Sequence, residues 1–186
     1  MELELIRGLL GAPELYYEVY PKTTGATESG GKIRHRLRAA WEAHNYPSEN
    51  IHFEHSPPTS TTHSVSITHS PGGTGFAWIR HPSRVGIDME KLSRISIPVI
   101  QRVSEPAEIG QAPNPLFIWS AKEAAFKSYW GTRNQPSLIS EVIVSDWSKK
   151  TTLGFSFNFS IGGQAKGRGF FLYQNETSMA LAVFTP

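Results

Sequence analysis

Two acidic residues near the middle of the chain have a spacing that suits cation binding. Asp88 and Glu90 lie two residues apart in the stretch VGIDME (85–90), so in a β-strand both side chains project from the same face. Two carboxylates on one face repel each other unless they are protonated, separated by water or bridged by a cation. A solvent-facing strand that carries two acids is the alternative, and this stretch alone leaves both interpretations open.

A third acid and a lysine lie in the stretch WSAKEAAFK (119–127), where Glu123 precedes Lys127 by one helical turn. A solvated pair in this order stabilises a helix by about 0.2–0.5 kcal/mol and is the simplest explanation. Mg²⁺, however, prefers oxygen ligands and commonly binds one or two carboxylates together with substrate phosphates. If this helix faces Asp88 and Glu90, Glu123 completes such a set. Lys127 would then contact the phosphate, an arrangement that stabilises a phosphoryl-type transition state.

The elements that must position these residues follow a repeated order. The apolar spacing predicts a helix over 32–47 and another over 116–130, each followed by strand patterns. The predicted strands are 15–20, 64–70, 74–80, 85–92, 140–147, 153–161, 170–174 and 178–184. Residues 64–92 are expected to form a three-stranded meander, 21–31 a loop, and 96–115 a Pro-rich bridge. The sequence therefore predicts an α+β fold of two similar helix-plus-antiparallel-meander halves, 1–95 and 96–186, that form a pseudo-dimer with the active site between them.

The composition narrows the class of protein. With 186 residues, 39% hydrophobic and 18% charged, the chain is typical of a globular protein. It contains no cysteine, which excludes disulfides, thiolate metal sites and a cysteine nucleophile. No apolar run approaches the roughly 18–20 residues of a membrane span, and MELELIRGLLG (1–11) lacks a basic leader, so we expect a cytoplasmic protein without a membrane partner. The net charge of +2 is too small to indicate a nucleic-acid partner.

Three stretches together resemble the signature motifs of the 4′-phosphopantetheinyl transferases. THS (68–70), GIDME (86–90) and WSAKEAAFK (119–127) are similar, in this order, to the family patterns S-H-S, G-I-D-I-E and W-x-x-K-E-x-x-x-K. SMALAVF (178–184) resembles the closing strand of the family, and the resemblance covers about residues 63–186. Because GIDME lies near mid-chain, the sequence is similar to the larger Sfp type, whose members are monomers with two similar halves.

The resemblance implies a reaction and a set of catalytic residues. Coenzyme A would donate its phosphopantetheine arm to a serine hydroxyl of an apo acyl carrier protein, or of a peptidyl or polyketide carrier domain, releasing adenosine 3′,5′-bisphosphate. By the family pattern, Asp88, Glu90 and Glu123 would hold Mg²⁺ against the pyrophosphate, and Lys127 would neutralise phosphate charge. Glu123, directly or through a metal-bound water, is the favoured base for the serine proton, although a bound cation lowers the pKa of a carboxylate.

Further contacts to coenzyme A are expected from two other places. By the family pattern, His69 and Ser70 would contact a coenzyme A phosphate, whereas a lone histidine beside an apolar strand is more often structural. Arg34 and Arg38, one turn apart on the basic helix, lie where the family binds the 3′-phosphate of coenzyme A. Their alternative role is a solubilising face opposite the apolar stripe of this helix, and the sequence supports both equally.

Two rival functions remain at this point. One is a protein of the same fold that binds coenzyme A or another nucleotide as a regulator and transfers nothing. The other is a nucleic-acid-binding module that uses the arginine-rich helix and whose affinity would depend steeply on salt. The second rival gives no reason for Asp88, Glu90 and Glu123 to converge.

Overall fold

The computed structural model describes residues 2–21, 30–55, 57–133, 135–163 and 165–185. The chain forms a mixed α+β fold with antiparallel sheets and few helices. The helices are α1 (Glu2–Leu10), α2 (Gly30–Ala43), α3 (Ile97–Val103), α4 (Pro106–Gln111) and α5 (Phe117–Ser128). The strands are β1 (Tyr16–Pro21), β2 (Ile51–His52), β3 (Thr59–Ser60), β4 (His63–Ser70), β5 (Gly73–Arg80), β6 (Arg84–Lys91), β7 (Val142–Lys149), β8 (Gly154–Ile161), β9 (Ala165–Gln174) and β10 (Thr177–Phe184).

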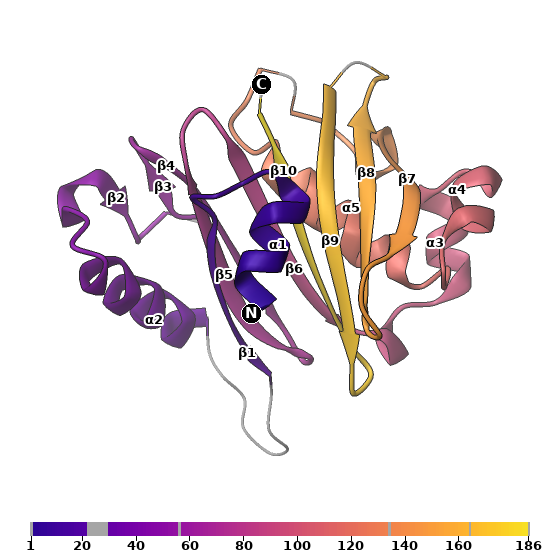
Figure 1. The fold of residues 1–186 in the computed structure, drawn as a ribbon, viewed down its shortest axis with the longest axis horizontal. Helices are drawn as coiled ribbons and strands as arrows, with labels where there is room; N and C mark the ends of the chain where they lie inside the picture. The colour runs from indigo at the N-terminus through magenta and orange to yellow at the C-terminus, as the bar shows by residue number, and fades with distance from the viewer. Residues whose placement is uncertain (1, 22–29, 56, 134, 164, 186) are drawn as a thin grey trace.

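Two larger sheets stand side by side in the molecule (Figure 1). One has the strand order β1-β5-β4 and the other β6-β10-β9-β8-β7, while β2 and β3 form a short hairpin. Helix α2 covers the outer side of the first sheet, and α5 packs on the second, against β6 and β10. The predicted strands and both predicted helices are therefore present, with α2 ending at Ala43 instead of 47. Most of the predicted loop 21–31, residues 22–29, lies outside the described residues.

The predicted three-stranded meander over residues 64–92 is wrong in its third strand. β4 and β5 form a hairpin, but β6 pairs in register with β10, from Arg84 opposite Phe184 to Lys91 opposite Thr177. Residues 1–95 thus contribute a strand to the sheet built mainly by residues 142–184. Division of the chain into two similar halves at residue 95 stays a prediction.

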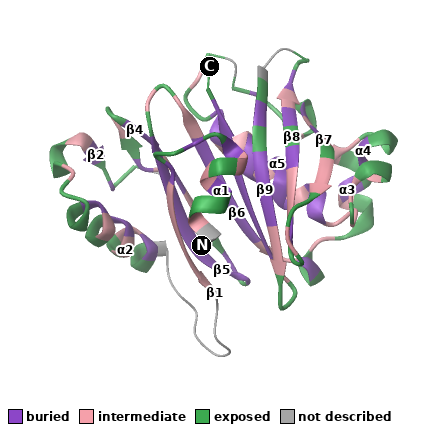
Figure 2. Cartoon of the chain, viewed as in Figure 1, coloured by how far each residue is buried: buried purple, intermediate pink, exposed green. Residues whose placement is uncertain are grey.

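Side-chain hydroxyl groups join the two sheets where a main-chain ladder would be expected. The backbone N–H groups of Val85, Ile87 and Met89 on β6 donate to hydroxyls of β4 at 3.1, 3.1 and 3.0 Å. The acceptors are Ser64, Ser66 and Thr68, in that order. These three residues alternate along β4 and are buried, so the polar face of this strand is the buried one. Figure 2 shows that buried residues are concentrated along the strands of the two larger sheets, whereas α2 is largely exposed on its outer side. The polar face can be buried because each hydroxyl accepts a hydrogen bond from an N–H of β6 that would otherwise lack a partner.

The opposite face of β4 looks toward α2. There, Ile33, Leu37 and Trp41 are fully buried against Phe76 and Trp78 of β5. The predicted apolar stripe of this helix is confirmed for these three positions. His44, the next residue at the same helical spacing, lies beyond the helix end and is exposed.

Residues 96–115, expected as an irregular bridge, contain α3 and α4. Each is a short helix with a proline in its first turn, where the missing N–H costs nothing. Their few residues show too little periodicity to predict a helix. Of the helices in the described ranges, none combines the length and apolar character that crossing a membrane requires.

Gly86 sets how closely α5 approaches β6. A Cβ atom at Gly86 would lie 1.8 Å from the carbonyl oxygen of Ala124 and 2.7 Å from the backbone nitrogen of Ser128. The other α5 residues at this contact, Ala121 and Ala125, are also small and fully buried. Small residues on both sides therefore bring the helix backbone directly onto the strand.

We predict that Gly86→Ala lowers the free energy of unfolding by at least about 3 kcal/mol, because backbone atoms, unlike a side chain, cannot rotate away from the new methyl group. Urea denaturation monitored by circular dichroism measures the change. Gly8→Ala in α1 is the matched control, since nothing lies within 4 Å of its added Cβ, and it should leave stability unchanged or raise it by up to about 1 kcal/mol. Equal stabilities of the two variants would contradict the close contact.

Candidate functional site

The acidic face of β6 lies against α5. Gly86, Asp88 and Glu90 alternate with the apolar residues of β6, and the close contact at Gly86 brings the helix over this face. Lys127 of α5 reaches Asp88: its Nζ donates to Asp88 Oδ1 at 2.7 Å and to the carbonyl oxygen of Ile87 at 3.2 Å. The structure thus brings together the strand and the helix that carry the predicted site residues.

Asp88 is a buried carboxylate with only one of its oxygens paired. Its side chain is 9% exposed and forms an ion pair with Lys127. The second oxygen, Oδ2, is buried and has no hydrogen-bond partner among the described residues. A buried oxygen without a partner is costly, so this atom is a natural point of contact for a cation or for a donor from a ligand.

The negative charges of both acids of β6, Asp88 and Glu90, act on the carboxyl group of Glu123. Burial raises the pKa of its carboxyl group, the negative charge of Asp88 raises it further, and that of Glu90 adds to this, while Lys127 opposes them. Its carboxylate accepts no hydrogen bond from any residue that the structure describes. Glu123 is thus half-buried, close to like charges and available to a ligand.

Glu90 is turned away from this meeting point. Its Oε1 accepts the N–H of Lys91 at 2.8 Å and lies 3.8 Å from Nη1 of Arg94, whose side chain is 58% exposed. Within the described ranges, no three Asp, Glu or His side chains converge closely enough to hold a metal ion as they lie. That Asp88, Glu90 and Glu123 bind one ion therefore stays a prediction. In the side-chain positions described, Lys127 pairs with Asp88 and Arg94 lies near Glu90.

The turn between β4 and β5 lies beside the end of β6. A Cβ on Gly72 would lie 3.1 Å from backbone atoms of both Glu90 and Lys91, so this turn packs on the acidic end of the strand. His69, directly before the turn, is exposed. Ser70 is buried, and its Oγ accepts the N–H of Gly72 at 3.0 Å, which gives this hydroxyl a structural role in the turn.

The predicted arginines lie away from the acidic face. Arg34 and Arg38 belong to α2, and Figure 1 shows α2 and α5 on different sides of the molecule. The guanidinium carbon of Arg38 lies 4.6 Å from the centre of the Phe53 ring. A ligand that contacts both the arginines and Asp88 must therefore be long and extended.

A buried ion pair that the sequence interpretation missed holds α5 in place. Lys122 is fully buried, and its Nζ lies 3.0 Å from both carboxylate oxygens of Glu108 on α4. The same ammonium group donates to the carbonyl oxygen of Val142, and Glu108 accepts the N–H of Val144 at 2.8 Å. The pair joins α4, α5 and β7 and fixes the rotation of α5, so that the next residue, Glu123, faces β6. No local signal marks Glu108 as its partner, because 14 residues separate the two.

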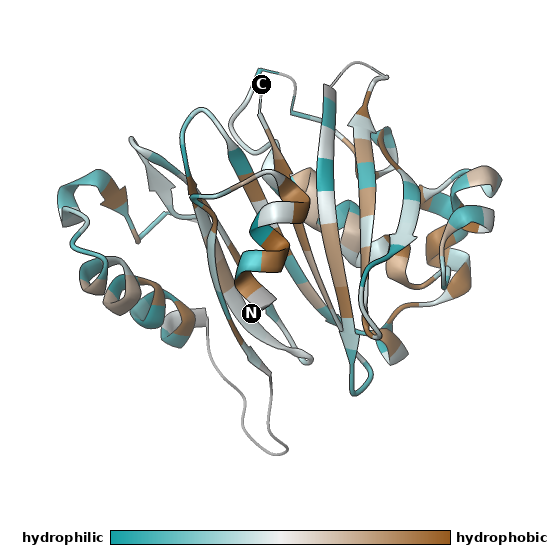
Figure 3. Ribbon diagram, viewed as in Figure 1, coloured by the Kyte–Doolittle hydropathy of each residue, from teal (hydrophilic) through white to brown (hydrophobic). Residues whose placement is uncertain are grey.

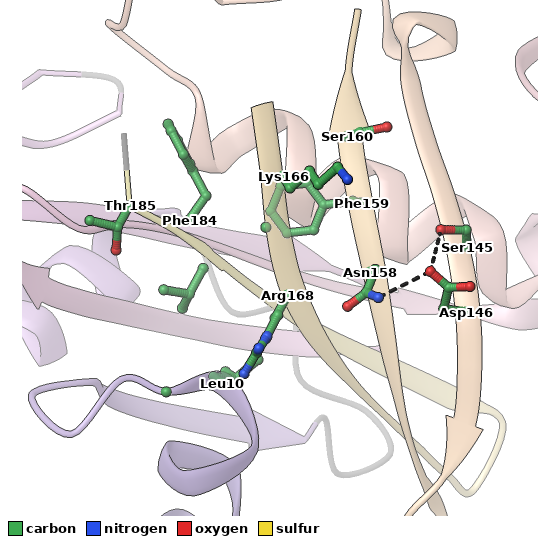
Figure 4. A pocket seen from close by; sticks show the side chains of 13 residues that line it. Leu10, Ser145, Asp146, Asn158, Phe159, Ser160, Lys166, Arg168, Phe184 and Thr185 are labelled. Carbon is green, nitrogen blue, oxygen red and sulfur yellow. Dashed lines mark hydrogen bonds between the residues drawn. The ribbon is translucent and has the colours of Figure 1, made fainter. Parts of the chain in front are cut away.

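A cavity of about 580 Å³ lies elsewhere, beside the end of α1 (Figure 4). Lys166 and Arg168 of β9 line it, and Asn158 donates to Asp146 at 3.0 Å on its other wall. Figure 3 shows that β9 is hydrophilic toward this end and hydrophobic in its middle part. No acid of β6 or α5 lines this cavity, so it is separate from the acidic face.

No protein-family model matches the sequence, and no curated protein matches it significantly either.

We predict that Lys122→Met lowers the free energy of unfolding by about 3–5 kcal/mol, because it leaves the charge of Glu108 buried and uncompensated. Chemical denaturation measures the loss. Lys149→Met, at an exposed position, is the control and should change stability by no more than about 0.5 kcal/mol. A loss no larger than that of the control would show that the pair does not hold α5.

We also predict that Glu123→Gln is more stable than the wild type at pH 7 and loses this advantage near pH 4. Because the pKa of Glu123 is raised in the folded state, stability falls as the pH rises from the ordinary carboxyl range through the raised value. Glutamine resembles the protonated form at every pH and escapes this loss. Urea denaturation at both pH values, with exposed Glu42→Gln as the control, measures the difference; an advantage that grows toward low pH would contradict the assignment.

Proposed function

We propose that the protein is a 4′-phosphopantetheinyl transferase of the Sfp type. It would transfer the phosphopantetheine group from coenzyme A to a serine of an apo carrier protein, with Mg²⁺ as its cofactor. The observation that carries the proposal is the position of Glu123, half-buried on the helix that packs on β6, where burial raises its pKa and the charges of Asp88 and Glu90 raise it further. Three motifs that are far apart in the sequence supply the turn at His69, the acids of β6 and the helix that carries Glu123. The finer fold prediction, a pseudo-dimer of two similar halves acting as a cytoplasmic monomer, belongs to the same proposal.

The donor set suits magnesium in its chemistry. All of its candidate ligands are oxygens, and Asp88 Oδ2 is buried without a partner in the described part of the chain. Asp88, Glu123 and Glu90 would hold the ion. Glu90 becomes available at low cost because its contact with the exposed Arg94 is long and surface pairs contribute little. When bound, Mg²⁺ would neutralise pyrophosphate charge and polarise the reacting phosphorus centre.

The residues of the chain itself would divide the remaining work. Glu123 would accept the proton of the carrier serine hydroxyl, directly or through a metal-bound water, because its half-buried carboxylate accepts no hydrogen bond from the described residues and is free to face a ligand. The serine oxygen attacks the phosphorus next to the pantetheine arm. One P–O bond forms there as the P–O bond to adenosine 3′,5′-bisphosphate breaks, and the leaving group takes the electron pair. Lys127 stays close enough to Asp88 to place its ammonium group beside the charge that develops on phosphate.

Binding of coenzyme A would extend from the acidic face past the β4–β5 turn. His69 is exposed next to the end of β6 and is positioned to meet a phosphate there. The 3′-phosphate would lie toward Arg34 and Arg38 on α2. Coenzyme A would have to bind in an extended conformation to reach both these arginines and the acidic face.

A coenzyme A-binding regulator without transferase activity is the second candidate. The side-chain positions favour it in one respect, because the acids in the described ranges are not gathered into a metal site. The two candidates differ in what Glu123 does: a transferase needs its carboxylate for turnover, whereas a pure binder uses it at most for metal affinity.

We predict that incubation with coenzyme A, Mg²⁺ and a panel of apo acyl, peptidyl and polyketide carrier proteins adds one phosphopantetheine mass to at least one carrier. Glu123→Gln should slow this by about 10²-fold or more, the usual contribution of a general base, and Glu42→Gln should not. Intact-protein mass spectrometry measures both rates, and calorimetry measures coenzyme A binding to each variant. Folded protein that modifies no carrier but binds coenzyme A would support the regulator, and Glu123→Gln with full turnover would exclude Glu123 as the base.

A further inference from the structure

A cavity of about 410 Å³ lies at the end of α2 that leads toward β2 (Figure 1). It is far along β4 from the proposed site, because it opens beside His63, the first residue of this strand, and His69 lies near its end. Its walls are mainly aromatic and basic: Tyr16, His44, Tyr46, His63, Trp78 and Arg80. We call this cavity the aromatic pocket. Its volume is in the range of small-molecule sites.

The aromatic walls are held by contacts with one another and by hydrogen bonds to neighbouring groups. The ring of Tyr16 stacks on Trp78 with centroids 4.3 Å apart, and its hydroxyl donates to Glu18. The ring of His44 packs edge-on against Tyr16 at 4.4 Å, with Nδ1 2.8 Å from the carbonyl oxygen of Ala40. A surface whose rings are already held in place binds a ligand without the entropic cost of ordering them.

One guanidinium group at the pocket is uncommitted. Arg80 is exposed and forms no hydrogen bond or ion pair with any residue in the described ranges, and it is close enough to His63 to affect its charge. Arg7, also on the rim, is occupied, because it donates to the carbonyl oxygen of Leu15 at 2.8 Å and to Glu4 at 2.6 Å. Arg80 is therefore the cation available to a ligand.

His63 provides a neutral polar atom at the pocket floor. Its side chain is mostly buried, and Nδ1 lies 2.8 Å from the hydroxyl oxygen of Thr62. Its other nitrogen, Nε2, pairs with no described residue. Burial lowers the pKa of His63, the charges of His81 and Arg80 lower it further, and the opposing effect of Glu14 is the smallest. Among the residues that line the pocket, two are arginines, Arg7 and Arg80, and one is an acid, Glu14, which favours an anionic ligand over a cationic one.

We infer that the aromatic pocket binds a small aromatic or heteroaromatic anion, with the ring against Tyr16, Tyr46 and His44 and its carboxylate or phosphate on Arg80. Stacked and edge-on aromatic contacts supply affinity for a planar ring, and a guanidinium group is suited to a two-oxygen anion. His63 Nε2 offers one hydrogen bond to a polar substituent of the ligand.

The test uses three small probes on the whole protein at pH 7.5: benzoate, cyclohexanecarboxylate and benzylamine. Proton–nitrogen correlation spectra follow the amide and indole signals of the pocket during each titration. We expect saturable binding of benzoate, about two- to tenfold tighter than that of cyclohexanecarboxylate because only the former stacks. None of the probes contains a nucleotide, so the result does not depend on the proposed coenzyme A site.

Arg80→Gln is the decisive variant, since an exposed side chain can be changed without loss of the fold. It should weaken benzoate binding about tenfold or more, and Arg102→Gln, an exposed arginine of α3, should leave it unchanged. Unaltered benzoate affinity in Arg80→Gln, or the absence of saturable benzoate binding to the wild type, would overturn the inference. Tighter binding of benzylamine, abolished by Glu14→Gln, would overturn it in favour of a cation site.

Discussion

The direct contact between the backbones of α5 and β6 determines where every acid of the candidate site lies. Gly86 permits it, because any side chain there would enter the carbonyl of Ala124. One turn along the helix, the same closeness lets Lys127 reach Asp88 and places Glu123 among like charges. The repulsion between like charges at the site is therefore a result of this packing. The ion pair of Lys122 and Glu108 stabilises the packing from the opposite side of the helix.

Two described regions, the acidic face and the aromatic pocket, contain polar groups without a hydrogen-bond partner. The two regions suit ligands of different charge. At the acidic face the unsatisfied groups are carboxylates beside one ammonium group, which suits a cation and a phosphate together. At the aromatic pocket the free group is a guanidinium beside preformed rings, which suits a planar anion. They lie toward opposite ends of β4, so ligands at the two places would not compete for space.

Local patterns were sufficient to predict the helices with long apolar stripes and most of the strands. Ile33, Leu37 and Trp41 repeat at helical spacing and are buried as that spacing requires. The sheet partner of β6 was not predictable, because it depends on hydroxyls of β4 that take up the N–H groups on one edge of β6 only in the folded protein. The sequence predicted that the helix carrying Glu123 and Lys127 faces the strand of Asp88, as α5 and β6 do, but it did not predict the side-chain positions. The orientation of Glu90 depends on Arg94, and the charge of Asp88 is neutralised by Lys127. Residue spacing alone predicts neither of these two contacts.

The hydroxyl groups between β4 and β6 restrict how this protein can evolve. Each of them accepts a hydrogen bond from a backbone N–H of β6 in the buried contact between the sheets. An alanine or valine there would leave that N–H without a partner, and a larger polar side chain would push the sheets apart. Accepted substitutions at positions 64, 66 and 68 should accordingly be exchanges between serine and threonine. These short polar side chains thus form a buried contact between two sheets, and only serine and threonine suit it.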